Sequence, residues 1–212
     1  MADLHDGIDI KEILERNKEW AKEKVESDDG FFARTSEKQT PHIFWIGCSD
    51  SRVPANVVTT LDFGELFVVR NVANIASGND LGFLATLQYA VNALKVDHIV
   101  VCGHTGCGGV KASMSDHTDT SVKPGVGLVS HWLAPVRQLY KSNAHLFQDI
   151  ADPEVAANLL VKLNVRAQVD SVCSNPVVQL AWERGQPLEV HGWVYDLRDG
   201  ILRDLDCTHS GP

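Results

Sequence analysis

The stretch HIFWIGCSDSR, residues 42–52, joins a short apolar run to a polar turn rich in reactive side chains. A second run of the same kind, HIVVC at residues 98–102, ends directly before Gly103 and His104. Short continuous apolar runs are typical of strands that are covered on both faces, as in parallel sheets. Because ligands gather at the carboxyl ends of such strands, we expect the two turns to face one another at one edge of a sheet.

The remaining pattern alternates apolar strands with helices. Further strands are expected at residues 65–70 and 189–197, and Asp199-Gly200 signals a hairpin into an antiparallel strand at 201–205. Helices are expected at residues 9–26, 54–58, 80–94, 127–141, 153–172 and 176–185, with a polar loop over 27–39. This order predicts an α/β fold with a mostly parallel central sheet, about four parallel strands plus an antiparallel edge strand, flanked by helices.

Length, charge and hydropathy limit the classes of protein to which this chain can belong. The chain has 212 residues, and at about 150 residues per domain it is expected to form one compact domain. A net charge of −9 argues against nucleic acid as a partner, since such proteins need a basic surface. No apolar stretch is long enough for a membrane span. The acidic N-terminus lacks a signal sequence, so a cytoplasmic location is expected, or an organelle if a targeting segment has been removed.

Three side chains in the two turns have the chemistry of metal ligands. Cys48, His104 and Cys107 form a Cys₂His set, and thiolate with imidazole suits zinc. Three protein ligands with an open fourth position are the pattern of a catalytic zinc, here one Zn²⁺ per chain. The alternative is that these are buried free thiols in an apolar setting. The odd number of cysteines, five, does not indicate a disulfide framework.

Asp50 and Arg52 follow Cys48 at two-residue intervals. A guanidinium beside a carboxylate keeps the carboxylate ionised and orients it through two hydrogen bonds. Such an Asp beside a metal can accept a hydrogen bond from a metal-bound hydroxide or bind the metal itself. The alternative is an ordinary surface ion pair, which contributes little.

The motif at residues 48–52, CSDSR, together with HTGC at 104–107 resembles the β-class carbonic anhydrases. The likeness extends to RNVAN at 70–74, QYAV at 88–91 and HGWVYD at 191–196, and covers the chain from about residue 10 to residue 206. The resemblance implies that Cys48, His104 and Cys107 bind zinc and that Asp50 and Arg52 are the catalytic pair. It also implies reversible hydration of carbon dioxide to bicarbonate and a proton, by attack of a zinc-bound hydroxide.

The family also suggests how the chain is organised and where the substrate binds. Members of the family are obligate dimers, often paired into tetramers, so a homodimer or homotetramer is expected. Residues 1–35 would form a helical arm that embraces the partner subunit, and 36–212 the zinc-binding catalytic domain. The thin apolar stripe of residues 9–26 fits such an arm. The positions that match the family's substrate pocket are Gln39, Phe67, Val72, Tyr89 and the backbone N–H of Gly108.

A bicarbonate site outside the catalytic pocket is also suggested by resemblance. Trp45, Arg70 and Tyr195 match the residues that form it in some bacterial-type members. In those enzymes bicarbonate accompanies a closed state in which the counterpart of Asp50 binds zinc, so activity is expected to fall at low pH and with added bicarbonate. The alternative is that all three residues are structural.

Two other functions remain open from the sequence. The same scaffold could hydrolyse carbonyl sulfide or carbon disulfide, which sequence alone does not distinguish from carbon dioxide hydration. The chain could also be a non-catalytic, zinc-stabilised dimer. The intact Asp50 and Arg52 count against that reading.

Overall fold

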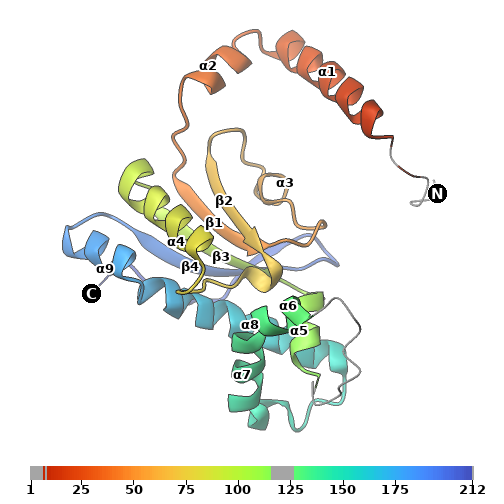
Figure 1. The fold of residues 1–212 in the computed structure, drawn as a ribbon, viewed down its shortest axis with the longest axis vertical. Helices are drawn as coiled ribbons and strands as arrows, with labels where there is room; N and C mark the ends of the chain where they lie inside the picture. Colours follow the sequence, from red (N-terminus) through yellow and green to blue (C-terminus); the bar gives the residue numbers. More distant parts are fainter. Residues whose placement is uncertain (1–6, 8, 116–126, 212) are drawn as a thin grey trace. The chain divides into compact units, whose positions relative to one another are not determined.

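The computed structural model describes residue 7, residues 9–115 and residues 127–211. The chain divides into two compact units, Met1–Gln39 and Thr40–Pro212 (Figure 1). The boundary expected after residue 35 from the family resemblance stays a prediction. Within the described residues, no helix combines the length and the apolar composition needed to cross a bilayer.

The N-terminal unit contains helices α1 (Ile10–Ser27) and α2 (Phe31–Glu37). The Asp9 side chain caps α1 by accepting a hydrogen bond from the backbone N–H of Lys11. None of the residues of α1 is buried within the described chain, and its apolar Ile10, Ile13 and Leu14 are exposed. Since these three lie at helical spacing on one face, α1 presents an apolar stripe that its own unit leaves uncovered.

Helix α2 corrects the expectation of a loop over residues 27–39. The Phe31 ring is buried and packs edge-on against Phe32, with ring centroids 5.0 Å apart. Phe32 also meets Trp20 of α1 at 5.9 Å, and Arg34 pairs with Asp28 just before the helix. These contacts, of which only the one with Trp20 comes from another helix, stabilise a helix that the polar composition of the stretch does not indicate.

The second unit is built on a five-stranded sheet of order β2-β1-β3-β4-β5. The strands are β1 (Ile43–Cys48), β2 (Leu66–Asn71), β3 (His98–His104), β4 (Glu189–Tyr195) and β5 (Leu202–Asp204). The first four strands pair in parallel and β5 is antiparallel to β4, which confirms the predicted sheet. The β1–β3 register places Gly47 opposite Cys102, so the two turns that follow start at one edge.

The helices of this unit mostly follow the predicted ranges. They are α3 (Ala55–Thr59), α4 (Leu81–Gln88), α5 (Gly108–Ser113), α6 (Gly127–Trp132), α7 (Ala134–Ser142), α8 (Pro153–Cys173) and α9 (Pro176–Glu183). Short turns are η1 (Val72–Asn74), the π-helical η2 (Tyr89–Leu94) and η3 (Ala144–Phe147).

Two predicted helices differ in detail from the structure. The helix expected at 80–94 changes from α to π geometry at Tyr89. The helix expected at 127–141 is two helices, α6 and α7, separated by Leu133. Pro135 lies in the first turn of α7, where its missing N–H leaves no hydrogen bond unmade, and it could not continue a helix from α6 without breaking one.

The central strands β1 and β3 are buried on both faces, which accounts for their continuous apolar runs. Phe44, Ile46, Ile99 and Val101 join the larger core cluster with residues of α4, α8 and α9. The alternate residues of β1 and β3 belong to a second cluster, in which Trp45, Val100 and Cys102 pack with Ala55 of α3. A strand that is covered on both faces needs apolar side chains at every position.

Helix α8 lies directly against the end of β3 because Gly103 has no side chain. A Cβ atom at Gly103 would meet Val165 Cγ2 at 2.7 Å and Val161 Cγ1 at 3.1 Å. This close approach fixes the backbone immediately before His104 against the longest helix of the unit.

Candidate metal centre

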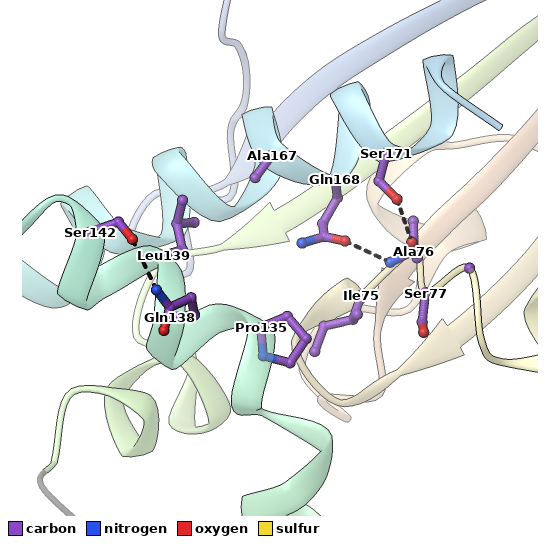
Figure 2. Close-up of a pocket in the computed structure, with 11 residues that line it drawn as sticks. Ile75, Ala76, Ser77, Pro135, Gln138, Leu139, Ser142, Ala167, Gln168 and Ser171 are labelled. Carbon is purple, nitrogen blue, oxygen red and sulfur yellow. Dashed lines mark hydrogen bonds between the residues drawn. The ribbon is translucent and has the colours of Figure 1, made fainter.

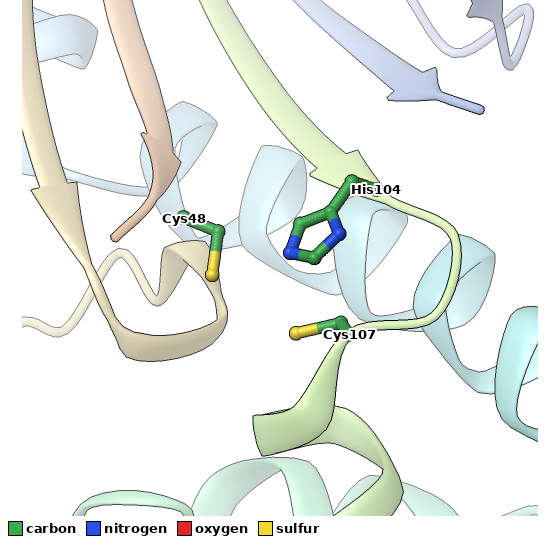
Figure 3. Close-up of side chains that lie close together, drawn as sticks. All are labelled: Cys48, His104 and Cys107. Atoms are coloured by element: carbon green, nitrogen blue, oxygen red, sulfur yellow. The ribbon is translucent and has the colours of Figure 1, made fainter. Parts of the chain in front are cut away.

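Cys48, His104 and Cys107 meet at the carboxyl edge of the sheet. Cys48 ends β1, His104 ends the neighbouring β3, and Cys107 stands directly before α5. Their ligand atoms all lie within 4.8 Å of one another, and all three residues are buried. Figure 3 shows the two sulfur atoms and the imidazole ring directed toward a common point. The parallel pairing of β1 and β3 therefore brings together the residues that the sequence singled out.

The imidazole of His104 has a nitrogen that is ready to bind a metal. Its Nδ1 lies 3.0 Å from the carbonyl oxygen of Thr105, and since a carbonyl only accepts, Nδ1 carries the proton. Nε2 is then a bare lone pair, buried and without a hydrogen-bond partner among the described residues. A buried acceptor without a donor is costly unless a cation occupies the space in front of it.

The two thiols share one negative charge. A hydrogen bond from Cys107 holds the pKa of Cys48 down to about 4, although burial acts in the opposite direction. The nearby His104 and the backbone N–H groups of Asp50 and Ala73 lower this pKa further. The same hydrogen bond to Cys48, together with burial, raises the pKa of Cys107 far above its ordinary value. A divalent cation would replace the remaining proton and leave two thiolates. The donor set and its unpaired nitrogen thus fit zinc.

Asp50 lies beside this cluster and is held by Arg52. Arg52 Nε donates to Asp50 Oδ1 at 2.9 Å and Nη2 donates to Oδ2 at 2.7 Å. This pairing holds the pKa of the Asp50 carboxyl well below its usual range. Asp50 Oδ2 is 3.7 Å from His104 Nε2, outside the ligand group of the two cysteines and the histidine. The carboxylate is therefore ionised, oriented and within reach of whatever binds between the ligands.

Arg70 ties the turn after β1 to the end of β2. Its Nε donates to the carbonyl oxygen of Cys48 at 2.8 Å, and its Nη2 donates to that of Asp50. Trp45 and Tyr195 both belong to the small cluster on the α3 face of the sheet, where Trp45 is fully buried. One guanidinium therefore binds two carbonyl oxygens of the turn that carries Cys48 and Asp50.

Comparison with known proteins decides the family. The sequence model of the family described as carbonic anhydrase matches residues 43–202. A solved β-carbonic anhydrase of Coccomyxa, in complex with acetazolamide, has a TM-score of 0.89 and 39% identity, covering 97% of this chain and 90% of its own. This chain belongs to the β-class carbonic anhydrases.

Other relatives agree with this assignment. A carbonic anhydrase of Emericella nidulans is 43% identical over 200 residues, which are 94% of this chain and 84% of the relative. One of two tetrameric β-carbonic anhydrases of Sordaria macrospora has a TM-score of 0.86 and 36% identity, covering 94% of this chain and 98% of its own. The resemblance and the enzyme class predicted from the sequence are confirmed, and the protein is a carbonic anhydrase.

Of the five residues expected around the substrate in this carbonic anhydrase, two contact one another and the others lie on separate elements. Phe67 of β2 and Tyr89 at the start of η2 have ring centroids 5.7 Å apart, so they form one aromatic pair. Val72 lies in η1, and Gly108 is the first residue of α5. Gln39 is the last residue of the N-terminal unit. The roles of all five toward the substrate stay predictions.

A buried ladder of polar side chains on α8, which the sequence did not predict, supports the site. Asn164 Nδ2 donates to the carbonyl oxygen of Ala73 at 3.0 Å, Gln168 Nε2 donates to Asn164 Oδ1 at 3.0 Å, and the Ala76 N–H donates to Gln168 Oε1 at 2.9 Å. Ala73 has φ of +64°, a backbone conformation that needs such support in a residue other than glycine. Two buried amides four residues apart on an otherwise apolar helix face were the available signal.

A second missed contact holds the turn after β3. Thr105 Oγ1 donates to Asp196 Oδ1 at 3.0 Å and accepts from the backbone N–H of Leu197 at 3.0 Å. The residue after His104 is thereby anchored to the end of β4. The matching segment at residues 191–196 was noted in the sequence, but its contact with Thr105 depends on the pairing of β3 with β4.

A separate hollow lies between α7, α8 and the segment after β2. Figure 2 shows its lining, which includes Ile75, Pro135, Leu139 and Gln168, with the Ala76–Gln168 hydrogen bond at one side. None of its lining residues is charged or carries a thiol or imidazole. It therefore offers no metal ligand of the kind found at the Cys48–His104–Cys107 cluster.

Proposed function

We propose that Cys48, His104 and Cys107 bind one Zn²⁺ and that the enzyme hydrates carbon dioxide reversibly to bicarbonate and a proton. The observation that carries the zinc is the buried, unpartnered Nε2 of His104 beside two thiols that share one charge. Bound there, zinc supplies a water whose pKa is lowered toward neutrality.

The task proposed for Asp50 is to orient the attacking oxygen. Because Arg52 occupies both of its oxygens from one side, the carboxylate stays ionised and cannot take up a proton near neutral pH. An ionised carboxylate only accepts hydrogen bonds, so it directs the O–H of the nucleophile toward itself and leaves a lone pair for the carbon of the substrate.

The proposed pocket suits an uncharged, linear substrate. Phe67, Tyr89 and Val72 supply apolar surface, and the pairing of Phe67 with Tyr89 supports one continuous wall. The backbone N–H of Gly108 is the proposed donor to the negative oxygen that develops in the transition state. The role expected of Gln39 stays a prediction. A CO₂ molecule has no charge for the site to neutralise, so orientation against an apolar wall is what binding requires.

Stopped-flow CO₂ hydration tests this function directly. We expect a metal-dependent rate that is lost when a chelator removes zinc and restored when one equivalent is added back. The same treatment of the His104→Gln variant is the control, because added zinc should not restore its rate. A preparation that binds zinc with full occupancy and shows no metal-dependent hydration would contradict the proposal and favour the non-catalytic dimer.

We also propose that the enzyme is a homodimer, alone or paired into a tetramer, as the Sordaria macrospora relatives are described as tetrameric. The exposed stripe of Ile10, Ile13 and Leu14 on α1 supports a partner for that face. Light scattering on Leu14→Glu, with Lys18→Glu as a control on the same helix, tests it. A wild-type monomer at micromolar concentration would refute the proposal.

We further propose that bicarbonate regulates activity through Arg70. Its guanidinium holds the carbonyl oxygens of Cys48 and Asp50, so an anion that draws on Arg70 would loosen the turn that orients Asp50. Trp45 and Tyr195 are the residues proposed to complete the anion site. Hydration rates are expected to fall with added bicarbonate in the wild type and less so in Trp45→Ala. A flat response in both proteins from pH 7 to pH 8.5 excludes the regulation.

A further inference from the structure

A second group of metal-ligating side chains lies at the opposite edge of the sheet. His98 begins β3, the strand that His104 ends, and Glu189 begins the neighbouring β4. The parallel register places His98 opposite Glu189, and His191 is two residues further along β4. Since side chains alternate along a strand, Glu189 and His191 share a face of the sheet. The strand pairing alone therefore brings two imidazoles and a carboxylate together.

The three ligand atoms form a triangle of the right size for a metal ion. His98 Nδ1 is 3.1 Å from His191 Nε2, and Glu189 Oε2 is 3.4 Å from the first nitrogen and 3.6 Å from the second. In a tetrahedral zinc site with metal–ligand bonds of about 2.0–2.1 Å, the ligand atoms are about 3.3 Å apart. An ion therefore fits in front of this triangle with small movements of the side chains.

The hydrogen bonds place one shared proton where an ion would bind. His191 Nδ1 lies 3.0 Å from Thr208 Oγ1, an outer contact of the kind that orients ligating histidines. When Nδ1 donates to Thr208, His191 Nε2 is a lone pair that faces His98 Nδ1. One proton then occupies the space between the two rings, and a cation can replace it.

The surroundings favour a neutral ligand set and a positive ion. Burial, together with the neighbouring His98, lowers the pKa of His191 and so favours its neutral ring. The side chains of His98 and Glu189 are 42% and 45% exposed, so an ion has a path from solvent. Asp204 adds negative charge near His191. Asp97, the residue before His98, pairs with His42 at a distance of 2.7 Å.

We propose that His98, Glu189 and His191 bind a second divalent transition-metal ion of the zinc class, separate from the Cys48–His104–Cys107 centre. Two imidazole nitrogens select Zn²⁺, Cu²⁺, Ni²⁺ or Co²⁺ over Mg²⁺ and Ca²⁺, which prefer oxygen ligands. Two histidines and a glutamate leave a fourth position open, which water or a small anion can occupy. The ion links the starts of β3 and β4.

Metal counting on the full, tag-free chain tests the site. The protein as purified is dialysed to equilibrium against micromolar Zn²⁺, and bound metal is measured by atomic emission above the content of the undialysed protein. We expect one additional zinc per chain in the wild type and none in His98→Gln or His191→Gln. Glu189→Gln should weaken this binding by about tenfold or more. His145→Gln, an exposed histidine outside the cluster, is the matched control and should keep the additional ion.

Cobalt distinguishes the second site from the first. Co²⁺ added to the zinc-loaded protein should give weak visible bands without the strong near-ultraviolet absorption of cobalt–thiolate bonds. Thiolate absorption would show exchange into the cysteine centre and overturn the proposal. So would the absence of an additional zinc in the wild type, or its persistence in both histidine variants. Glu189→Gln keeps the size of a half-exposed side chain, so its result remains interpretable if a histidine variant does not fold.

Discussion

Strand β3 begins and ends with a histidine, and the two residues meet different surroundings. The His104 side chain is fully buried, and its Nε2 has no hydrogen-bond partner among the described residues. The His98 side chain is 42% exposed and has His191 and Glu189 within 3.1 and 3.4 Å. A buried nitrogen without a hydrogen-bond partner is stabilised only when a cation binds to it, because water does not reach it. His98 has hydrogen-bond partners with or without a bound ion. The amino-terminal edge of the sheet should therefore bind metal more weakly than the carboxyl-terminal edge.

Exchanging the histidine at either end of β3 tests this contrast most strongly. His104→Gln should lose the tightly held zinc and lower CO₂ hydration by a factor on the order of 10³. His98→Gln should keep the tightly held zinc and lose only the additional ion. Metal content after extended dialysis and stopped-flow rates are the measurements. If His104→Gln kept both its zinc and its rate, the assignment of the two edges would be wrong.

The two carboxylates give the next largest effect. Asp50 lies outside the cysteine–histidine ligand group and is held by Arg52, whereas Glu189 belongs to its own ligand triangle. Asp50→Asn should therefore keep zinc but lower kcat roughly 100-fold or more, because the amide can donate to the nucleophile instead of accepting from it. Metal content and rate are measured on one preparation. Full activity in Asp50→Asn would remove Asp50 from the mechanism.

The packing behind the carboxyl edge sets the third prediction. Gly103→Ala puts a Cβ atom 2.7 Å from Val165 Cγ2 on α8, and the overpacking should cost ~1–3 kcal/mol of unfolding free energy. Denaturant unfolding measures it. Gly78→Ala is the control, because its Cβ atom would meet nothing within 4 Å. Equal stability of the two variants would mean that α8 is not held against β3 as described.

The smallest expected effect concerns the anchor of Thr105. Asp196 has its pKa lowered from 3.8 to about 2, first by the backbone N–H and side chain of Arg198 and also by Thr105. A carboxyl whose pKa is lowered by folding stabilises the fold above pH 3.8 and loses that contribution as the pH falls toward 2. Asp196→Asn should therefore be slightly less stable than the wild type at pH 7, and the difference should shrink in acid. A gap that stays constant from pH 7 into acid would contradict this account.

The features that depend on residues close together in the sequence could be predicted from the sequence. The apolar runs before Cys48 and Gly103 indicated parallel strands, and the motifs beyond them supplied all three residues of the candidate metal centre. A continuous apolar run is typical of a strand that is buried on both faces. The spacing of Asp50 and Arg52 also indicated their ion pair, which the structure shows with two hydrogen bonds.

Features that depend on distant residues could not be predicted in this way. Helix α2 needs Trp20 of another helix, and the start of α7 depends on Pro135 rather than on periodicity. The cluster of His98, Glu189 and His191 joins residues more than 90 positions apart. It follows only from the β3–β4 register, which no local signal specifies.

The ladder on α8 has a consequence for how the protein is made. Ala73, whose N–H supports Cys48, is held by Asn164, a residue synthesised 91 positions later. During synthesis there is a stage at which Cys48, His104 and Cys107 have been made but α8 has not. At that stage the turn at Ala73 lacks its hydrogen bond from Asn164. Contacts between residues so far apart form late. If the three ligands bind zinc as proposed, the nascent chain is expected to hold the ion firmly only after α8 has left the exit tunnel. Translation would then set the earliest moment of metal loading.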